Sequence, residues 1–219
     1  MKRNKLFIGS RASKLALIYA NKVKNEISKH YNKEIIIKEI NTTGDNKIDI
    51  RLSELGGKGL FSKNIENELL NKNIDLAVHA LKDLPSFDTE GLVTNCFLKR
   101  NNSNEVMISN SNKKLNDLVP GSIVGTSSFR REFQLKRIRK DLNFKLIRGN
   151  VDTRIRKLKS GEYDAIILAK AGLSSLNLDK EITQEFSNND LIPSAGQGTI
   201  AVQCRNCLLY TSPSPRDKR

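Results

Sequence analysis

Short apolar runs alternate with stretches of helical periodicity along the first half of the chain. Four runs predict strands: Leu6–Ile8, Ile35–Ile37, Ile74–Ala80 and Gly91–Leu98. Between them, apolar residues recur at the spacing of one helix face. The first such set follows Ser13, a plausible N-cap, and the second includes Phe61, Ile65 and Leu69.

The second half repeats this alternation. Its predicted strands are Val106–Ile108, Ile123–Gly125, Phe144–Ile147 and Tyr163–Ala169. A basic helix is expected to carry Phe129, Phe133 and Leu142, and another should span Val151–Leu158 with Gly161 as its stop signal. Strands alternating with helices favour mainly parallel sheets covered by helices, which is the α/β class.

Polar segments divide the chain into parts. Lys99–Asn104 is the expected boundary between two α/β units. An apolar run, Thr199–Cys204, follows the Gly196-Gln-Gly198 segment and predicts one more strand. From Asn206 to Arg219 no periodicity remains, so residues 206–219 are expected to be a disordered or non-native tail.

Composition limits the class of protein. The 219 residues are 37% hydrophobic and 28% charged, as in globular domains. No apolar run is long enough to span a bilayer, and the basic N-terminus lacks the apolar stretch of a secretory signal, so a cytoplasmic protein is expected. Three cysteines give no disulfide framework, and no metal site is expected.

A net charge of +14 would attract polyanions. Aromatic residues make up only 5% of the chain, and no basic–aromatic platform of the kind that binds nucleic acid is present. We therefore expect neither a nucleic-acid partner nor a membrane.

The densest chemical candidate is the segment from His79 to Pro85, directly after a predicted buried strand. Ligands of α/β sheets bind beyond the carboxyl ends of strands, so Lys82 and Asp83 could place a carboxylate in a partly desolvated crevice. The alternative is a plain turn in which Asp83 caps a backbone group. His79 is interpreted as a hydrogen-bonded core histidine rather than a catalyst.

A second candidate is the turn Thr126-Ser127-Ser128, which leads into the basic helix. Free N–H groups at a helix start attract anions. Arg130 and Arg131 in the first turn oppose the helix dipole, and a bound anion would offset that penalty. The other basic residues of this helix are interpreted as a solvated face: Lys136, Arg137, Arg139 and Lys140.

Further arginines stand near predicted strand ends. Arg11 and Arg148 follow strands, and Arg154 lies in the helix after Arg148. Guanidinium groups donate paired hydrogen bonds to carboxylates, so the pattern suggests one crevice for a ligand with many carboxylates. The glycine-rich loop that contains Lys58 and leads to Phe61 could cover such a site.

Taken together and in order, these segments resemble the porphobilinogen deaminase family from about Lys5 to Arg205. The matching segments are Gly9–Ala16, Gly56–Phe61, Ala77–Pro85, Gly125–Arg131, Arg148–Val151, Tyr163–Ala169 and Gly196–Gly198. Each motif alone is weak, but the ordered set is specific.

The resemblance implies two lobes like those of periplasmic binding proteins. The first would comprise residues 1–98 and 194–205, and the second residues 99–193. It implies a monomeric transferase of haem and tetrapyrrole biosynthesis that condenses four porphobilinogen molecules, with loss of ammonia, into hydroxymethylbilane. The family's dipyrromethane cofactor hangs from a cysteine in a third, α+β domain, which this chain lacks, so the chain as given is expected to be inactive.

The resemblance also assigns roles to residues. Asp83 would be catalytic, and Lys58 and Phe61 would belong to an active-site loop. The expected cofactor contacts are Lys82, Thr126, Ser127, Ser128, Arg130, Arg131 and Arg148. The expected substrate contacts, for porphobilinogen and its oligomers, are Arg11, Arg148, Arg154 and Gln197.

Two departures from the family pattern stand out. Ser175 occupies a position where the family often has arginine, and no cysteine here is a credible cofactor attachment residue: Cys96, Cys204 and Cys207. The alternative function is a small-anion binding module of the same fold without catalysis. Such a module would normally need a secretory signal and would not need Asp83.

Overall fold

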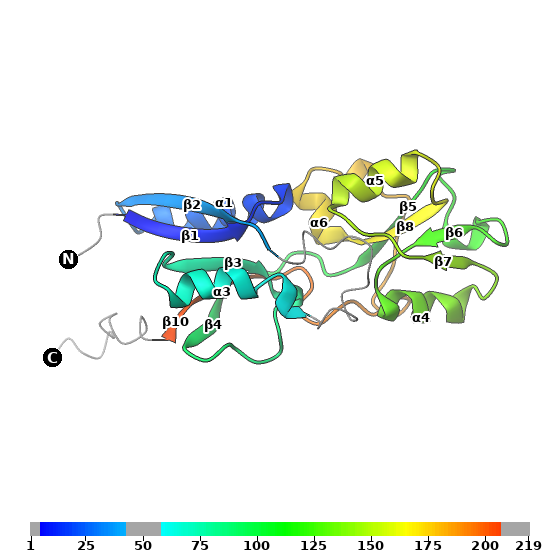
Figure 1. The fold of residues 1–219 in the computed structure, drawn as a ribbon. Helices are drawn as coiled ribbons and strands as arrows, with labels where there is room; N and C mark the ends of the chain where they lie inside the picture. Colours follow the sequence, from blue (N-terminus) through cyan, green and yellow to red (C-terminus); the bar gives the residue numbers. More distant parts are fainter. Residues whose placement is uncertain (1–4, 43–57, 207–219) are drawn as a thin grey trace. The chain divides into compact units, whose positions relative to one another are not determined.

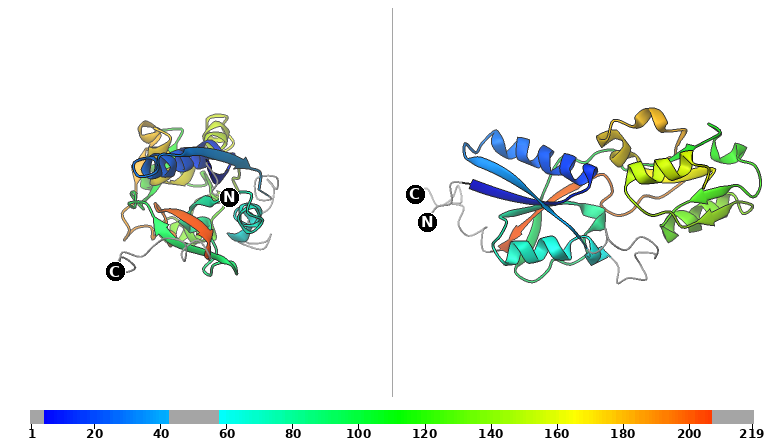
Figure 2. Two further views of the ribbon diagram at one scale, coloured as in Figure 1. Left: turned by 90° about the vertical axis from the view of Figure 1, so that its left-hand side faces the viewer. Right: turned by 45° about the horizontal axis from the view of Figure 1, so that its top comes forward.

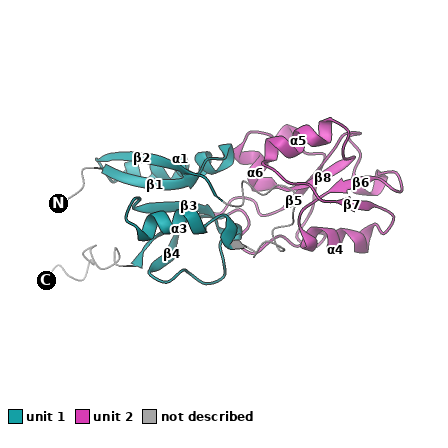
Figure 3. Ribbon diagram, in the orientation of Figure 1, with its two compact units in different colours: residues 1–46, 56–99, 199–219 teal, residues 47–55, 100–198 magenta. Residues whose placement is uncertain are grey.

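The computed structural model describes residues 5–42 and 58–206, which form two compact units (Figure 3). The described part of the first unit comprises residues 5–42, 58–99 and 199–206, and the second comprises residues 100–198. The expected tail therefore lies outside the described residues, except for Asn206. No helix in the described ranges is long and apolar enough to cross a membrane.

The first unit is built on a five-stranded sheet with the order β2-β1-β3-β10-β4 (Figures 1 and 2). The strands are β1 (Lys5–Arg11), β2 (Glu34–Ile40), β3 (Leu76–Ala80), β4 (Leu92–Phe97) and β10 (Ile200–Arg205). The helices are α1 (Lys14–Ser28) and α3 (Lys63–Leu70), with short 3₁₀ turns at Lys58–Leu60 and Leu81–Asp83. The last strand, β10, pairs between β3 and β4.

Alternation along the strands explains why helices cover both faces of this sheet. In β3, Val78 packs on the face of α1 with Tyr19, and Ala77 packs on the face of α3 with Ile65. Ser13 caps α1 as the sequence predicts, because its Oγ accepts a hydrogen bond from the Ala16 N–H at 3.4 Å.

The second unit has a five-stranded sheet with the order β7-β6-β8-β5-β9. The strands are β5 (Glu105–Ser109), β6 (Ile123–Gly125), β7 (Asn143–Lys145), β8 (Ala165–Ala169) and β9 (Gln184–Glu185). The helices are α4 (Phe129–Ile138), α5 (Val151–Lys159) and α6 (Lys170–Ser175), with 3₁₀ turns at Leu115–Asp117 and Asp179–Glu181. Leu135 of α4 packs on one face with Met107, and Ile155 of α5 packs on the other with Ile108.

The α/β class with mainly parallel sheets is confirmed, because four of the five strands in each sheet run in the same direction and one strand is reversed. In the first unit β10 runs antiparallel to both of its neighbours. In the second unit β5 runs antiparallel to β8 and β9. Apolar strands that are buried on both faces carry the same residue pattern in either direction, so the sequence pattern does not reveal this reversal.

The basic helix ends earlier than predicted, and one of its arginines is not solvated. α4 stops at Ile138, and Leu142 is buried beyond it. Arg139 leaves the helix with extended backbone, and its guanidinium donates to the carbonyls of Leu115 and Leu118. Its side chain is only 15% exposed, so the prediction that Arg139 lies on a solvated face is wrong.

Candidate functional site

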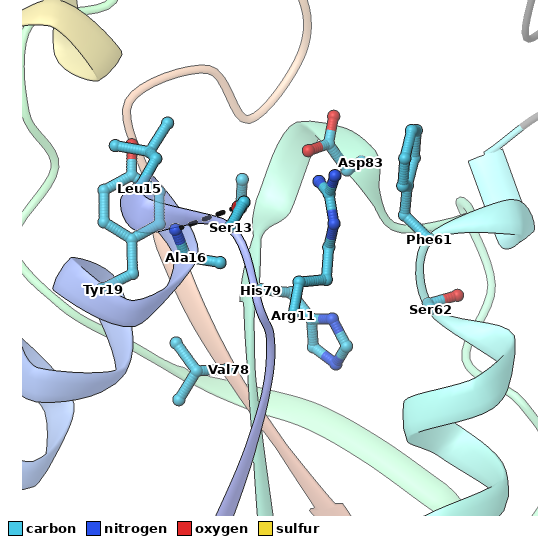
Figure 4. Close-up of a pocket in the computed structure, with 11 residues that line it drawn as sticks. Arg11, Ser13, Leu15, Ala16, Tyr19, Phe61, Ser62, Val78, His79 and Asp83 are labelled. Atoms are coloured by element: carbon cyan, nitrogen blue, oxygen red, sulfur yellow. Dashed lines mark hydrogen bonds between the residues drawn. The ribbon is translucent and has the colours of Figure 1, made fainter. Parts of the chain in front are cut away.

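In the first unit, two neighbouring parallel strands end at the same edge of the sheet, and polar side chains lie at both ends. β1 pairs in parallel with β3, so their carboxyl ends lie together. Arg11 is the last residue of β1, and Asp83 ends the 3₁₀ turn that follows β3. Both line a pocket of about 60 Å³ (Figure 4).

The aromatic ring of Phe61 lines the same pocket and lies against Arg11. Phe61, just before α3, lies with its ring centroid 4.2 Å from the Arg11 guanidinium carbon, in cation–π geometry. Figure 4 shows the side chains of Arg11, Asp83 and Phe61 along one side of the pocket. Three of the residues that the sequence analysis identified, Arg11, Phe61 and Asp83, therefore line one pocket. Lys82 is half-buried next to Asp83, whereas the side chain of Lys58 lies outside the described residues.

His79 lines the same pocket from β3 and is 8% exposed. Its Nε2 has no hydrogen-bond partner among the described residues. Burial lowers the pKa of His79 to about 4; Gln203 opposes that shift, and the nearby Arg11 adds to it. The imidazole is therefore neutral near pH 7, which fits a structural role better than acid catalysis.

The depressed pKa of His79 predicts that the fold weakens in mild acid. Between pH 6.5 and about 4 the unfolded chain binds a proton at this histidine that the folded chain does not, so stability falls as pH falls through this window. We expect His79→Gln to reduce that loss by roughly 3 kcal/mol, as measured by urea unfolding of the 219-residue chain at several pH values. The same replacement at exposed His30 is the control. Equal pH slopes in the His79 variant and the parent chain would contradict the assignment.

In the second unit, one edge of the sheet gathers the ends of several strands. β6 runs parallel to β7 and β8, so their carboxyl ends share this edge. β5 is antiparallel to β8, and its first residue, Glu105, is paired with Ala169 at the same edge. The Thr126–Ser128 turn follows β6, and Arg148 follows β7.

The hydroxyl groups of this turn build the start of α4. Thr126 is buried, and its Oγ1 accepts the Ser128 N–H at 3.2 Å. Ser128 is the N-cap, and its Oγ accepts the Arg131 N–H at 3.4 Å. Ser127 is half-buried between them. The turn thus holds the following arginines at a fixed place on the sheet edge.

Arg130 and Arg131 share one carboxylate. Nη2 of Arg131 lies 2.7 Å from Glu105 Oε2, and Nη2 of Arg130 lies 2.5 Å from Glu105 Oε1. Burial alone would raise the pKa of Glu105, but the Arg131 and Arg130 guanidiniums more than offset it, and the pKa is lowered. The protein itself therefore supplies one anion beside this helix start, and a bound anion there stays a prediction.

The remaining predicted residues are divided between two places. Arg148 is 5% exposed, and Arg154 Nε donates to the Gly149 carbonyl at 2.8 Å, so both lie at the turn between β7 and α5. Gln197 is buried elsewhere in the unit, where its Nε2 donates to the Ser103 carbonyl at 2.7 Å. Its substrate contact stays a prediction.

Glu105 is the residue that the sequence interpretation missed. A single carboxylate directly before the apolar run Val106–Ile108 was a usable signal, because a charge at a buried strand end requires a partner. Two consecutive arginines elsewhere in the same unit could have supplied it.

Comparison with known proteins gives a family match over nearly all of the chain. A family model described as "Porphobilinogen deaminase, dipyromethane cofactor binding domain" matches residues 6–208. The porphobilinogen deaminase of Bacillus pumilus is 49% identical over 202 residues, which cover 90% of this chain and 64% of the relative. That of Geobacillus kaustophilus is 47% identical over 204 residues, covering 91% of this chain and 65% of the relative. The chain thus spans slightly less than two thirds of these relatives.

Solved structures of ligand-binding proteins share the fold. A putative methionine-binding lipoprotein of Bacillus subtilis aligns with a TM-score of 0.54 at 13% identity, over 98% of this chain and 92% of the other. The BenM effector binding domain with benzoate aligns with a TM-score of 0.54 at 12% identity, over 97% of this chain and 96% of the other. At such low identity these likenesses establish only the architecture of two periplasmic-binding-protein-like lobes.

Proposed function

Because the chain belongs to the porphobilinogen deaminase family, we propose that it forms the substrate- and cofactor-binding units of a transferase that joins four porphobilinogen molecules into hydroxymethylbilane. The observation that carries the proposal is the pocket of the first unit, where Asp83 and Arg11 lie at the carboxyl ends of two parallel strands. The family places its catalytic aspartate at the position of Asp83.

The chemistry of Asp83 follows from the substrate. Porphobilinogen must lose its amino group as ammonia, and a carboxylic acid can donate the proton that the leaving amine needs. The carboxylate that remains stabilises the electron-deficient pyrrole and can accept the proton released when the new carbon–carbon bond forms. Arg11 in the same pocket is suited to holding a substrate carboxylate.

The residues of the second unit fit a ligand rich in carboxylates. Arg130, Arg131, Arg148 and Arg154 bring four positive charges to the ends of β6 and β7, and Glu105 pairs with two of them. The Arg130 side chain is 29% exposed. These arginines and the Thr126–Ser128 turn would contact the carboxylates of the dipyrromethane and the growing chain. For Lys82, in the first unit, we keep the cofactor contact that the resemblance implies. When bound, the dipyrromethane supplies the pyrrole to which the first substrate unit is joined.

The alternative, an anion-binding module without catalysis, is not favoured. It explains the arginines, but it gives no reason for a carboxylate at Asp83 beside Arg11 in the pocket. The match to the deaminase family also extends over residues 6–208 rather than over the arginine motifs alone.

A chimera tests the proposed reaction. Residues 5–206 would replace the matching segment of the Bacillus pumilus relative, so that the remaining third of that protein completes the chain. We expect the purified chimera to consume porphobilinogen and release hydroxymethylbilane, detected by its conversion to uroporphyrin and its absorbance. The unaltered relative is the positive control. A folded chimera without product would contradict the proposed function.

We further propose that the 219-residue chain by itself makes no hydroxymethylbilane. The resemblance places the cofactor thiol in a third domain, and among the described cysteines Cys96 is exposed on β4 and Cys204 is part-buried in β10, both in the first unit. Cys207 lies outside the described residues. A cytoplasmic, monomeric protein remains our expectation.

A further inference from the structure

Arg130 and Arg131 meet a carboxylate that has no contact with solvent. Glu105 is fully buried, and each of its oxygens accepts from a different guanidinium. A buried carboxylate is costly unless it is paired and hydrogen-bonded. Charge-assisted bonds to both oxygens therefore keep Glu105 ionised and fix two guanidiniums relative to the first residue of β5.

The two arginines differ in what they present to the surface. Arg131 is 6% exposed, its Nη1 also donates to the Ile167 carbonyl at 3.0 Å, and its Nε has no partner among the described residues. Arg130 donates to Glu105 and to the Ile192 carbonyl, yet its side chain is 29% exposed. A guanidinium carries five N–H donors, so these two bonds leave donors of the partly exposed Arg130 for a ligand, whereas Arg131 faces the interior.

From this asymmetry we propose that Glu105 is a positioning residue, which makes Arg130 the carboxylate-binding member of the pair and Arg131 its buried support. The inference rests on the proposed function. It assigns different roles to Arg130 and Arg131, which the sequence did not distinguish. Without the shared carboxylate, two adjacent like charges repel each other, and the Arg130 fork loses the anchor that orients it. The cluster keeps one net positive charge, from two guanidiniums and one carboxylate, to attract the ligand.

The decisive variant is Glu105→Gln in the chimera. An amide keeps the shape but removes the charge, so we expect the KM for porphobilinogen to rise about 10–100-fold, the value of a lost charge-assisted interaction, with a much smaller change in kcat. Arg130→Lys should raise KM similarly in the parent chimera but add little in the Glu105→Gln background, because the two residues act as one unit.

A binding measurement separates this inference from the proposed reaction. Calorimetric titration of the 219-residue chain with porphobilinogen should show weaker binding by a similar factor in the Glu105→Gln variant. If the parent chimera is inactive, the proposed function fails, and the titration still reports on Glu105. The matched control is Glu181→Gln, which removes a partly exposed glutamate paired with Lys159 at the other end of α5.

Folding of the variants is checked by thermal unfolding. If Glu105→Gln does not fold, Glu105→Asp decides, because it keeps the charge on a shorter side chain that reaches both guanidiniums less well. We then expect KM and the dissociation constant to rise at least about threefold, a loss of about 0.7 kcal/mol. Unchanged binding in a folded variant, or additive effects of Glu105→Gln and Arg130→Lys, would overturn the positioning role.

Discussion

Asp83→Asn is expected to lower the turnover of the chimera by about 10²–10⁴, the usual range for a lost general acid or base. The amide keeps nearly the same size and polarity in the pocket beside Arg11, so folding and cofactor loading should be preserved. It can neither donate the proton that the leaving amine needs nor neutralise the positive charge on the pyrrole. The measurement is kcat for hydroxymethylbilane release at saturating porphobilinogen.

The matched control is Asp117→Asn, which removes an exposed carboxylate from the 3₁₀ turn Leu115–Asp117 of the second unit. Its turnover should equal that of the parent chimera. Intact mass and thermal unfolding of both variants establish that neither has lost the cofactor or the fold. If Asp83→Asn retains turnover within a factor of a few of the parent, Asp83 has no place in the proton transfers.

The elements around Asp83 were predictable because local signals agreed. Ser13 capped the first helix, and the apolar run through Ala77 and Val78 identified β3 and hence the turn at Asp83. In α/β folds the ends of such strands are where ligands bind, so the position of Asp83 followed from the strand. That Arg11 and Phe61 lie at the same pocket required the parallel pairing of β1 and β3, which the pattern suggested but did not fix.

The features that sequence reasoning missed depend on long-range pairing. Glu105 is 25 residues from Arg130, and only the antiparallel run of β5 against β8 brings its carboxylate to the start of α4. Arg139 was assigned to a solvated face because its neighbours are basic, yet its guanidinium binds carbonyls around Leu115. The spacing of residues along a helix predicts which of its faces is buried. It cannot identify a distant loop whose backbone carbonyls accept hydrogen bonds from that helix.

For the 219-residue chain incubated alone with porphobilinogen, we expect neither a gain in mass nor release of hydroxymethylbilane. The proposed reaction extends an oligomer from a covalently held dipyrromethane. The chain carries arginines suited to contact that group, but the resemblance places the thiol that anchors it in another domain. A site that binds carboxylates without the anchoring thiol should bind porphobilinogen reversibly and then release it unchanged.

Intact-mass spectrometry after removal of free porphobilinogen distinguishes the two cases. The chimera should gain the mass of one dipyrromethane, and the 219-residue chain should keep its calculated mass. A stable gain in the chain alone, mapped by peptide analysis to Cys96, Cys204 or Cys207, would place the attachment site within this sequence. Cys96 is exposed and Cys204 is part-buried, so incidental alkylation is expected first at Cys96. Replacing each by serine would then show whether such a gain is specific attachment or incidental alkylation.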